Sequence, residues 1–181
     1  MEISKQEIRW VLRAQTGDRE ALDELFRLVQ EPLYRYIVSL TGSRTLAEDI
    51  LQEVFILIYR NLRWLREPEL FRSWAYRIAS REAFKHLKRE RRWSEQSVDE
   101  SALEDVPVSP PDTLTPDLIA QLVAQISPAS RAVIVLHYLH EMPLGEIADV
   151  LGLALGTVKS RLAYGLAGLR KQLSTTTNTG N

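Results

Sequence analysis

The sequence predicts an all-α protein with two small helical domains joined by a flexible acidic linker, and with a helix-turn-helix at its C-terminal end. Apolar residues recur at three- and four-residue steps along most of the chain, whereas the strict alternation of strands is scarce. Residues 94–117 break this pattern, because they are acidic, rich in Ser and Pro, and aperiodic. So long an aperiodic stretch is unusual inside one compact domain, and we therefore divide the chain there.

The N-terminal domain, residues 1–93, begins with two predicted helices. An amphipathic helix over residues 3–15 is followed by Asp18, which is positioned to cap a second helix that ends at Gly42. Pro32 falls in the middle of that second helix. Because proline lacks a backbone N–H and clashes with the preceding turn, we expect a kink or a break there.

The third helix, TLAEDILQEVFILIYRNL, starts at Ser43 or Thr45 and is apolar enough to be buried on more than one side. A narrower stripe along it mixes acidic, amide, aliphatic and basic side chains. An apolar anchor within a polar rim is typical of a contact surface for a partner protein, and an ordinary solvent-exposed face is the alternative. This α3 stripe, as we name it below, consists of Asp49, Gln52, Glu53, Ile56 and Arg60.

The fourth helix, FRSWAYRIASREAFKHLKRERR, has an apolar face and a cationic face. Residues 60–92 contain eleven Lys and Arg against four acids, so the net charge of −1 hides a basic block. Regularly spaced cations suit a phosphate backbone and neighbouring aromatic rings suit unpaired bases, although a solvated face that binds nothing has the same pattern. The cationic face carries Arg77, Arg81, Lys85, Lys88 and Arg92, with Trp74 and Tyr76 near its start.

The C-terminal domain, residues 118–173, is predicted to be helical, and residues 174–181 are expected to form a disordered tail. A short helix over residues 118–126 comes first. Ser127 and Pro128 then form a typical helix start, with the serine as cap and the proline in the first turn.

The helix-turn-helix is the sharpest pattern in the chain. Pro143 opens its first helix, Gly152 lets the chain turn, and Gly156 begins the second helix. The second helix presents hydroxyl and basic groups that suit phosphates, and an arginine that can bind a guanine edge with two hydrogen bonds. A plain helical hairpin with a charged surface is the alternative. The outward residues are Thr157, Lys159, Ser160, Arg161 and Tyr164.

Several classes of protein are not indicated by the sequence. It has no cysteine, no nucleophile paired with a base and no glycine-rich phosphate loop, so we expect neither an enzyme nor a bound cofactor. His137, His140 and Glu141 share one helical side but lack the HExxH spacing, so we interpret them as packing or surface residues and expect no metal site. No apolar run is long enough for a bilayer and no signal peptide is evident, which predicts a cytoplasmic protein without membrane insertion.

Three segments resemble one protein family, the bacterial sigma factors of the extracytoplasmic-function (ECF) class, which are the two-domain form of the sigma-70 family. EIADVLGLALGTVKSRL resembles its promoter −35 reader, and AEDILQEVF and FRSWAYRIASREAFKHLKR resemble its N-terminal conserved domain. The resemblance extends from about residue 17 to residue 173. It implies a protein that binds core RNA polymerase, directs promoter recognition and starts transcription. The implied partners are the β′ clamp helices and β flap of polymerase, promoter DNA, and a separate anti-sigma protein.

The resemblance also implies roles for particular residues. Asp49, Gln52 and Glu53 match the part of the family that docks on the β′ clamp helices, and Ile56 and Arg60 complete that face. The loop before the fourth helix and the start of that helix match the −10 reader, which extrudes a base while the duplex melts. The implied −10 residues are Trp64, Arg66, Phe71, Trp74, Arg77, Arg81, Lys85 and Lys88, and the implied −35 residues are Thr157, Lys159, Ser160, Arg161 and Tyr164.

The chain departs from the family at some of these positions. Family members often carry Asn in place of Arg81, and Asp or Asn in place of Lys85, so we expect these two residues to hold the DNA backbone rather than to read bases. After Arg161 the family usually continues with more basic residues, whereas this chain reads AYGLAGL. Gly165 and Gly168 in that run each cost a helix about 1 kcal/mol, and we infer a weaker −35 grip or a surface partly made for protein.

The length of the linker gives a geometric expectation. Promoter elements two helical turns apart are separated by roughly 70 Å. The 24 residues at 94–117 span at most about 80 Å when extended, but only about 27 Å as a free coil. We therefore expect the two domains to lie close together in the free chain and to be held apart by polymerase.

Two other functions account for part of the sequence. A stand-alone helix-turn-helix regulator would bind duplex DNA without polymerase, but it leaves the basic helix and the α3 stripe without a role. A protein adaptor would bind no DNA, and it predicts no crosslinks from either basic block. Core polymerase separates these functions, because only a sigma factor starts transcripts with it.

Overall fold

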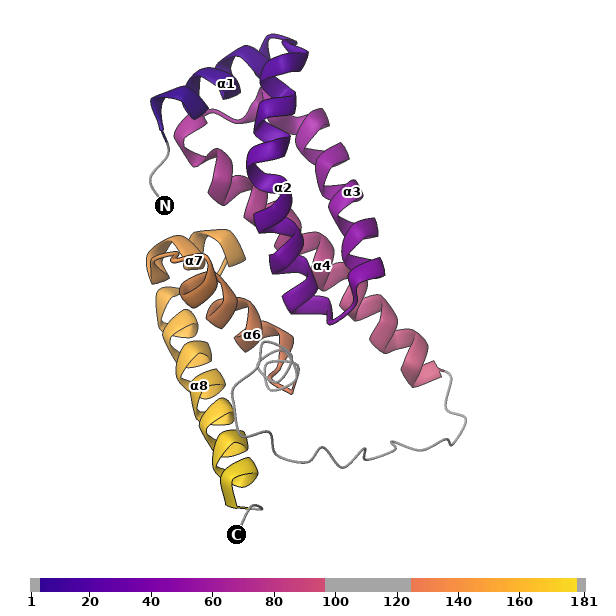
Figure 1. Cartoon of the computed structure of the whole chain (residues 1–181), viewed down its shortest axis with the longest axis vertical. Coiled ribbons are helices and arrows are strands. Elements are labelled where there is room, and N and C mark those ends of the chain that lie inside the picture. The colour runs from indigo at the N-terminus through magenta and orange to yellow at the C-terminus, as the bar shows by residue number, and fades with distance from the viewer. Residues whose placement is uncertain (1–3, 97–124, 179–181) are drawn as a thin grey trace.

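The computed structural model describes residues 4–96 and 125–178, and all regular secondary structure within these ranges is helical (Figure 1). The predicted all-α fold is therefore confirmed. The N-terminal half contains α1 (Lys5–Gln15), α2 (Arg19–Thr41), α3 (Arg44–Asn61), the short 3₁₀ turns η1 (Leu62–Trp64) and η2 (Pro68–Leu70), and α4 (Phe71–Gln96). The C-terminal half contains α6 (Pro128–Ile134), the π-helical turn η3 (Val135–Leu139), α7 (Leu144–Leu151) and α8 (Leu155–Asn178). Most of the expected linker, and almost all of the helix expected over 118–126, lie outside the described residues.

Side-chain caps set where several helices begin. Asp18 accepts a hydrogen bond of 3.1 Å from the backbone N–H of Ala21, as the sequence predicts. Of the two residues proposed to start the third helix, Ser43 is the cap of α3. Ser127 caps α6 in the same way. Each such cap satisfies a backbone N–H that has no partner within its helix, which is typically worth about 1 kcal/mol.

α2 runs as one helix through Pro32, so the chain is not split there. Seven side chains of α2 are buried, including Val29 and Leu33 on either side of the proline. Their packing outweighs the lost backbone hydrogen bond and the steric clash, which together cost about 3 kcal/mol in a helix interior. The predicted end at Gly42 is confirmed, because this glycine adopts the left-handed conformation, with a φ of 71°.

The C-terminal helix is longer than the sequence suggested. α8 extends to Asn178, so the prediction of disorder from residue 174 is wrong for most of that tail. α4 likewise continues to Gln96, into the stretch expected to be linker.

Gly165 lies where α8 packs against α6. A β-carbon at Gly165 would lie 2.5 Å from Cδ1 of Ile134 on α6. The glycine therefore permits the close packing of α6 against α8, a role that its low helix propensity did not reveal.

The two halves of the described chain pack against each other. α7 lies against α4, and α6 lies against α2. Buried apolar side chains from both halves form one contiguous cluster. This arrangement agrees with the expectation that the halves lie close together without polymerase. No helix in the described ranges is both long and apolar enough to cross a membrane.

Candidate nucleic-acid interface

One face of α3 is exposed along its length, while the opposite face is buried in the core. Ile50, Val54 and Ile58 are completely buried. Ile56 points the other way and is 50% exposed. In the α3 stripe, Asp49, Gln52, Ile56 and Arg60 are exposed and Glu53 is half-buried. An accessible apolar side chain within a polar rim is the arrangement that a protein contact needs.

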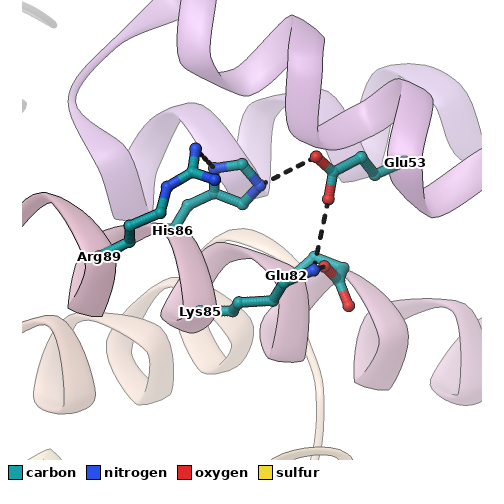
Figure 2. Close-up of polar contacts among 5 residues, drawn as sticks. All are labelled: Glu53, Glu82, Lys85, His86 and Arg89. Carbon is teal, nitrogen blue, oxygen red and sulfur yellow. Dashed lines mark hydrogen bonds and ion pairs between the residues drawn. The ribbon is translucent and has the colours of Figure 1, made fainter.

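Glu53 differs from the rest of the α3 stripe, because α4 holds its carboxylate. Figure 2 shows the contacts: Oε1 of Glu53 lies 3.1 Å from Nε2 of His86, and Oε2 lies 3.7 Å from Nζ of Lys85. Lys85 also pairs with Glu82 at 2.6 Å. The hydrogen bond from His86 is the main cause that lowers the pKa of Glu53, so its carboxylate is ionised at neutral pH.

Glu53, Glu82 and His86 also form the one cluster of three possible metal ligands within the described ranges, with ligand atoms within 4.8 Å of one another. The ammonium of Lys85 lies among these groups and compensates part of their negative charge. We interpret the cluster as an ion-pair network, because the lysine ammonium already pairs with both of its carboxylates.

Contacts with α1 fasten the loop between α3 and α4. The side-chain amide of Gln15 donates to the carbonyl oxygens of Leu62 and Leu65, at 3.0 and 2.7 Å. Arg72, at the start of α4, donates two hydrogen bonds of 2.9 and 2.7 Å to the buried Glu7. The sequence does not reveal these contacts, because their partners lie 47 to 65 residues apart and share no periodic pattern. They hold the proposed −10 loop in a fixed position.

Two tryptophans line a cavity between the end of α3 and the start of α4, which we call the tryptophan cavity. Trp64 is 68% exposed and carries the guanidinium of Arg63 4.7 Å from its ring centre, whereas Trp74 is half-buried. Arg66, further along the loop, is exposed. The cavity has a volume of about 430 Å³ and is lined by Leu57, Asn61, Trp64, Trp74, Ile78, Arg81 and Glu82. Aromatic faces beside hydrogen-bonding side chains can accommodate a base.

Phe71 does not reach the surface, although the resemblance placed it among the −10 residues. Its side chain is completely buried, and its ring centre lies 6.4 Å from that of Trp74. Phe71 belongs to the apolar face of α4 together with the buried Ala75 and Ala79, as their spacing predicts. We therefore remove Phe71 from the residues proposed to contact DNA and assign it the support of Trp74.

The cationic residues of α4 do not form one uniform surface. Arg81, Lys85 and Lys88 are exposed, whereas Arg77 is half-buried and its Nε atom has no hydrogen-bond partner in the described structure. Arg77 and Arg81 line a second cavity, of about 460 Å³, together with the end of α7. The C-terminal half thus covers part of the cationic face. The side chain of Arg92 lies outside the described residues.

α7 and α8 form the predicted helix-turn-helix. Ile147, Ala148 and Val158 are buried, and Gly152 turns the chain with a φ of 65°. On the outer face of α8, Thr157, Lys159, Ser160 and Tyr164 are exposed and Arg161 is half-buried. All five residues predicted for −35 DNA are therefore at least partly accessible in this arrangement.

Polar contacts join the two halves. The hydroxyl of Tyr76 on α4 lies 2.7 Å from Nδ1 of His140, which follows η3. The guanidinium of Arg131 on α6 donates to the backbone carbonyls of Leu40 and Ile126, at 2.8 and 3.0 Å. Burial lowers the pKa of His140 to about 4, so its ring is neutral at pH 7. This position agrees with the interpretation of His140 as a packing residue.

The all-helical fold and the helix-turn-helix place the chain in the class of helical DNA-binding transcription proteins. Family models identify two regions within it. Residues 25–93 match the model of Sigma-70 region 2, and residues 117–167 match that of Sigma-70, region 4.

Individual proteins show the same likeness. The ECF RNA polymerase sigma factor SigW of Bacillus subtilis (strain 168) is 29% identical over 179 residues, covering 90% of this chain and 94% of SigW. SigL of Mycobacterium tuberculosis (strain ATCC 25618 / H37Rv), also an ECF sigma factor, is 35% identical over 159 residues, covering 78% of this chain and 82% of SigL. The chain belongs to the sigma-70 family and, within it, to the ECF RNA polymerase sigma factors. It is a factor that directs transcription by RNA polymerase from specific promoters, so the stand-alone regulator is not favoured.

Solved structures share the fold. CnrH, in its complex with the cytosolic domain of CnrY, has a TM-score of 0.72 and 23% identity, covering 94% of this chain and 99% of CnrH. The sigma factor RpoE from Bartonella quintana, in its complex with the anti-sigma factor NepR, has a TM-score of 0.68 and 23% identity, covering 84% of this chain and 96% of RpoE. The two-part helical architecture is therefore found in sigma factors of known structure.

Proposed function

We propose that this sigma factor engages polymerase and promoter through three surfaces: the α3 stripe, the tryptophan cavity with the cations of α4, and the outer face of α8. The observation that carries the proposal is the placement of the first two surfaces on the same helix. Ile56 and its polar rim lie on the outer face of α3, and Leu57 and Asn61 of that helix line the tryptophan cavity. A β′ clamp helix bound to the stripe holds the melted −10 strand beside the cavity.

At the −10 element, an extruded base of the melted strand enters the tryptophan cavity and stacks on Trp64 or Trp74. Unstacking a base costs a few kcal/mol, and stacking on an aromatic side chain returns about 1–3 kcal/mol per base. The cations attract the backbone of the same strand without choosing its sequence. They are Arg66, Arg77, Arg81, Lys85 and Lys88.

At the −35 element, α8 enters the major groove of duplex DNA, as the second helix of a helix-turn-helix does. Arg161 reads a guanine edge, while Thr157, Lys159 and Ser160 hold phosphates. Tyr164 contacts the same groove or the adjoining backbone. The β flap of polymerase holds this C-terminal domain at the distance from the −10 domain that the spacing of the two promoter elements requires.

The working domains are residues 1–93 and 118–173, with residues 94–117 as the linker that polymerase holds open. In the packed arrangement, α7 adjoins Arg77 and Arg81 and limits their access to DNA. A separate anti-sigma protein that stabilises this arrangement would silence the factor. The complexes of CnrH with CnrY and of RpoE with NepR support a partner of this kind. The factor works in the cytoplasm, where polymerase and chromosome meet, and it acts by binding rather than by catalysis.

In vitro transcription with purified core polymerase and a promoter library tests the proposal. The unsubstituted chain should form a complex with core and start transcripts from a subset of promoters. Ile56→Glu should weaken core binding, whereas Leu12→Glu, at an equally exposed apolar site on α1 (both 50%), should not. Binding of duplex DNA without any complex with core would instead support the stand-alone regulator, and equal effects of both substitutions would reject the α3 stripe as the docking site.

A further inference from the structure

His86 is a buried histidine on α4 that faces the α3 stripe. Its side chain is only 6% exposed, and its Nε2 lies 3.1 Å from Oε1 of Glu53. Its other ring nitrogen, Nδ1, lies 3.4 Å from a terminal nitrogen of Arg89. Figure 2 shows the ring between these two side chains, with Glu53 on α3 and Arg89 on α4, the helix of His86 itself.

The identity of the neighbours determines where the ring carries its proton. A guanidinium can donate hydrogen bonds but cannot accept them, so Nδ1 of His86 must be the acceptor toward Arg89. The neutral ring then carries its proton on Nε2, which donates to the carboxylate of Glu53. Arg89 therefore orients the histidine, and the histidine orients Glu53.

Glu53 is held in a way that leaves it open to a partner. Its side chain is 43% exposed, so the carboxylate oxygens keep lone pairs that can accept from outside. Lys85 is a weaker restraint than His86, because it is 65% exposed, lies 3.7 Å away and pairs more closely with Glu82. The other polar side chains of the α3 stripe are exposed, and among the described residues they make no such contact with the buried side of α4.

We propose that His86 is a positioning residue for polymerase binding, because it fixes the carboxylate of Glu53 in the orientation that meets the donors of polymerase. The inference rests on the proposed docking of polymerase on the α3 stripe. A free glutamate side chain samples many rotamers and loses this freedom when it is bound, which weakens the complex. A carboxylate that is already held by a buried ring has lost that freedom on folding. The same contact ties the polymerase surface of α3 to the helix that carries the −10 cations.

A double-mutant cycle on the full chain tests the proposal. His86→Leu removes the donor and fills the same buried position with an apolar side chain of similar size. Glu53→Ala removes the acceptor. We expect His86→Leu to weaken binding to purified core polymerase about 2- to 10-fold, the size that follows from immobilising one flexible side chain. In the Glu53→Ala background the same substitution should change core affinity by less than about 2-fold. His86→Gln, which retains an N–H donor, should restore much of the affinity.

Thermal unfolding of each variant separates positioning from stability. Ala83→Gly is the matched control, since it loosens a buried position of α4 without touching Glu53. It should lower the melting temperature and leave core affinity unchanged. Loss of core affinity with His86→Leu that is equally large with and without Glu53 would overturn the positioning role. If the unsubstituted chain bound no core at all, the proposed function itself would fail, which is a distinct result.

Discussion

Tyr76 and His140 meet at the boundary between the two halves, where the tyrosine hydroxyl and Nδ1 of the histidine lie 2.7 Å apart. Tyr36 packs edge-on against both rings, with ring centres 5.5 and 6.0 Å away. The remaining ring nitrogen of His140, Nε2, is buried without a hydrogen-bond partner in the described part of the chain. A protonated ring would bury a charge and an unsatisfied N–H here, and the positive charge of Arg35 opposes it further.

Packing of the two halves should weaken as the pH falls from about 6.5 to about 4. The pKa of His140 is lowered from 6.5 to about 4, so in this window the opened chain binds a proton that the packed chain excludes. The packed arrangement therefore loses stability as the pH falls. Because His140 is partly exposed, we expect a loss of about 1 kcal/mol rather than the full shift. Small-angle scattering should show a rising radius of gyration in the unsubstituted chain. His140→Gln cannot be protonated and should expand less, so identical expansion of both chains would contradict the prediction.

Gly165 and Gly168 should respond oppositely to alanine. Both lie within α8, where alanine favours the helix over glycine by about 1 kcal/mol. At Gly168 the added β-carbon meets nothing within 4 Å, so Gly168→Ala should raise the free energy of unfolding. At Gly165 it would meet Ile134 at 2.5 Å and Ser130 at 3.3 Å, and overpacking of this kind costs about 1–3 kcal/mol. The free energies of unfolding of the two variants, measured with denaturant, should therefore differ by that amount. Equal stabilisation would show that the side chains of α6 move aside without cost.

Local patterns were sufficient to predict most of the fold. The caps at Asp18 and Ser127, the turn at Gly152 and the apolar face of α4 each depend on residues within a few positions of one another, so the sequence displays them directly. Of the kink and the break expected at Pro32, the structure excludes the break, because the local penalty of the proline is smaller than the packing of the long helix around it.

The proposed sites were predictable as faces but not as contacts. Spacing along α3 selected four exposed positions and the half-buried Glu53. Nothing near Glu53 in the sequence indicates His86, which lies 33 residues away on another helix. Phe71 shows the converse: its place beside the −10 loop suggested DNA contact, but its spacing with Ala75 and Ala79 decided its burial. Where resemblance and periodicity disagreed, periodicity was the better guide.

Replacing the tryptophans should impair melting of the promoter rather than binding of polymerase. Trp64→Ala or Trp74→Ala removes a stacking face of the tryptophan cavity, and the loss of stacking by one base corresponds to about 5- to 150-fold weaker binding. Binding of holoenzyme to a single-stranded −10 oligonucleotide should fall by such a factor, while core affinity remains. Leu70→Ala is the control, because Leu70 is exposed before α4 but does not line the cavity. Unchanged oligonucleotide binding in both tryptophan variants would remove the cavity from the proposed −10 site.

Arg81 should contribute more to DNA binding than Lys85, although the two residues lie on the same face of α4. Lys85 pairs with Glu82 at 2.6 Å and lies 3.7 Å from Glu53, so part of its charge is already compensated, whereas Arg81 has no ion pair among the described residues. Losing one phosphate contact reduces the salt dependence of binding by about one unit of slope. Holoenzyme with Arg81→Gln should therefore bind all promoters more weakly and show a flatter dependence on salt, and Lys85→Gln should show a smaller change of the same kind. Titrations over a range of salt concentrations, on several promoters, measure both slopes. A change in which promoters are bound, at an unaltered slope, would mean that these side chains read bases instead of holding the backbone.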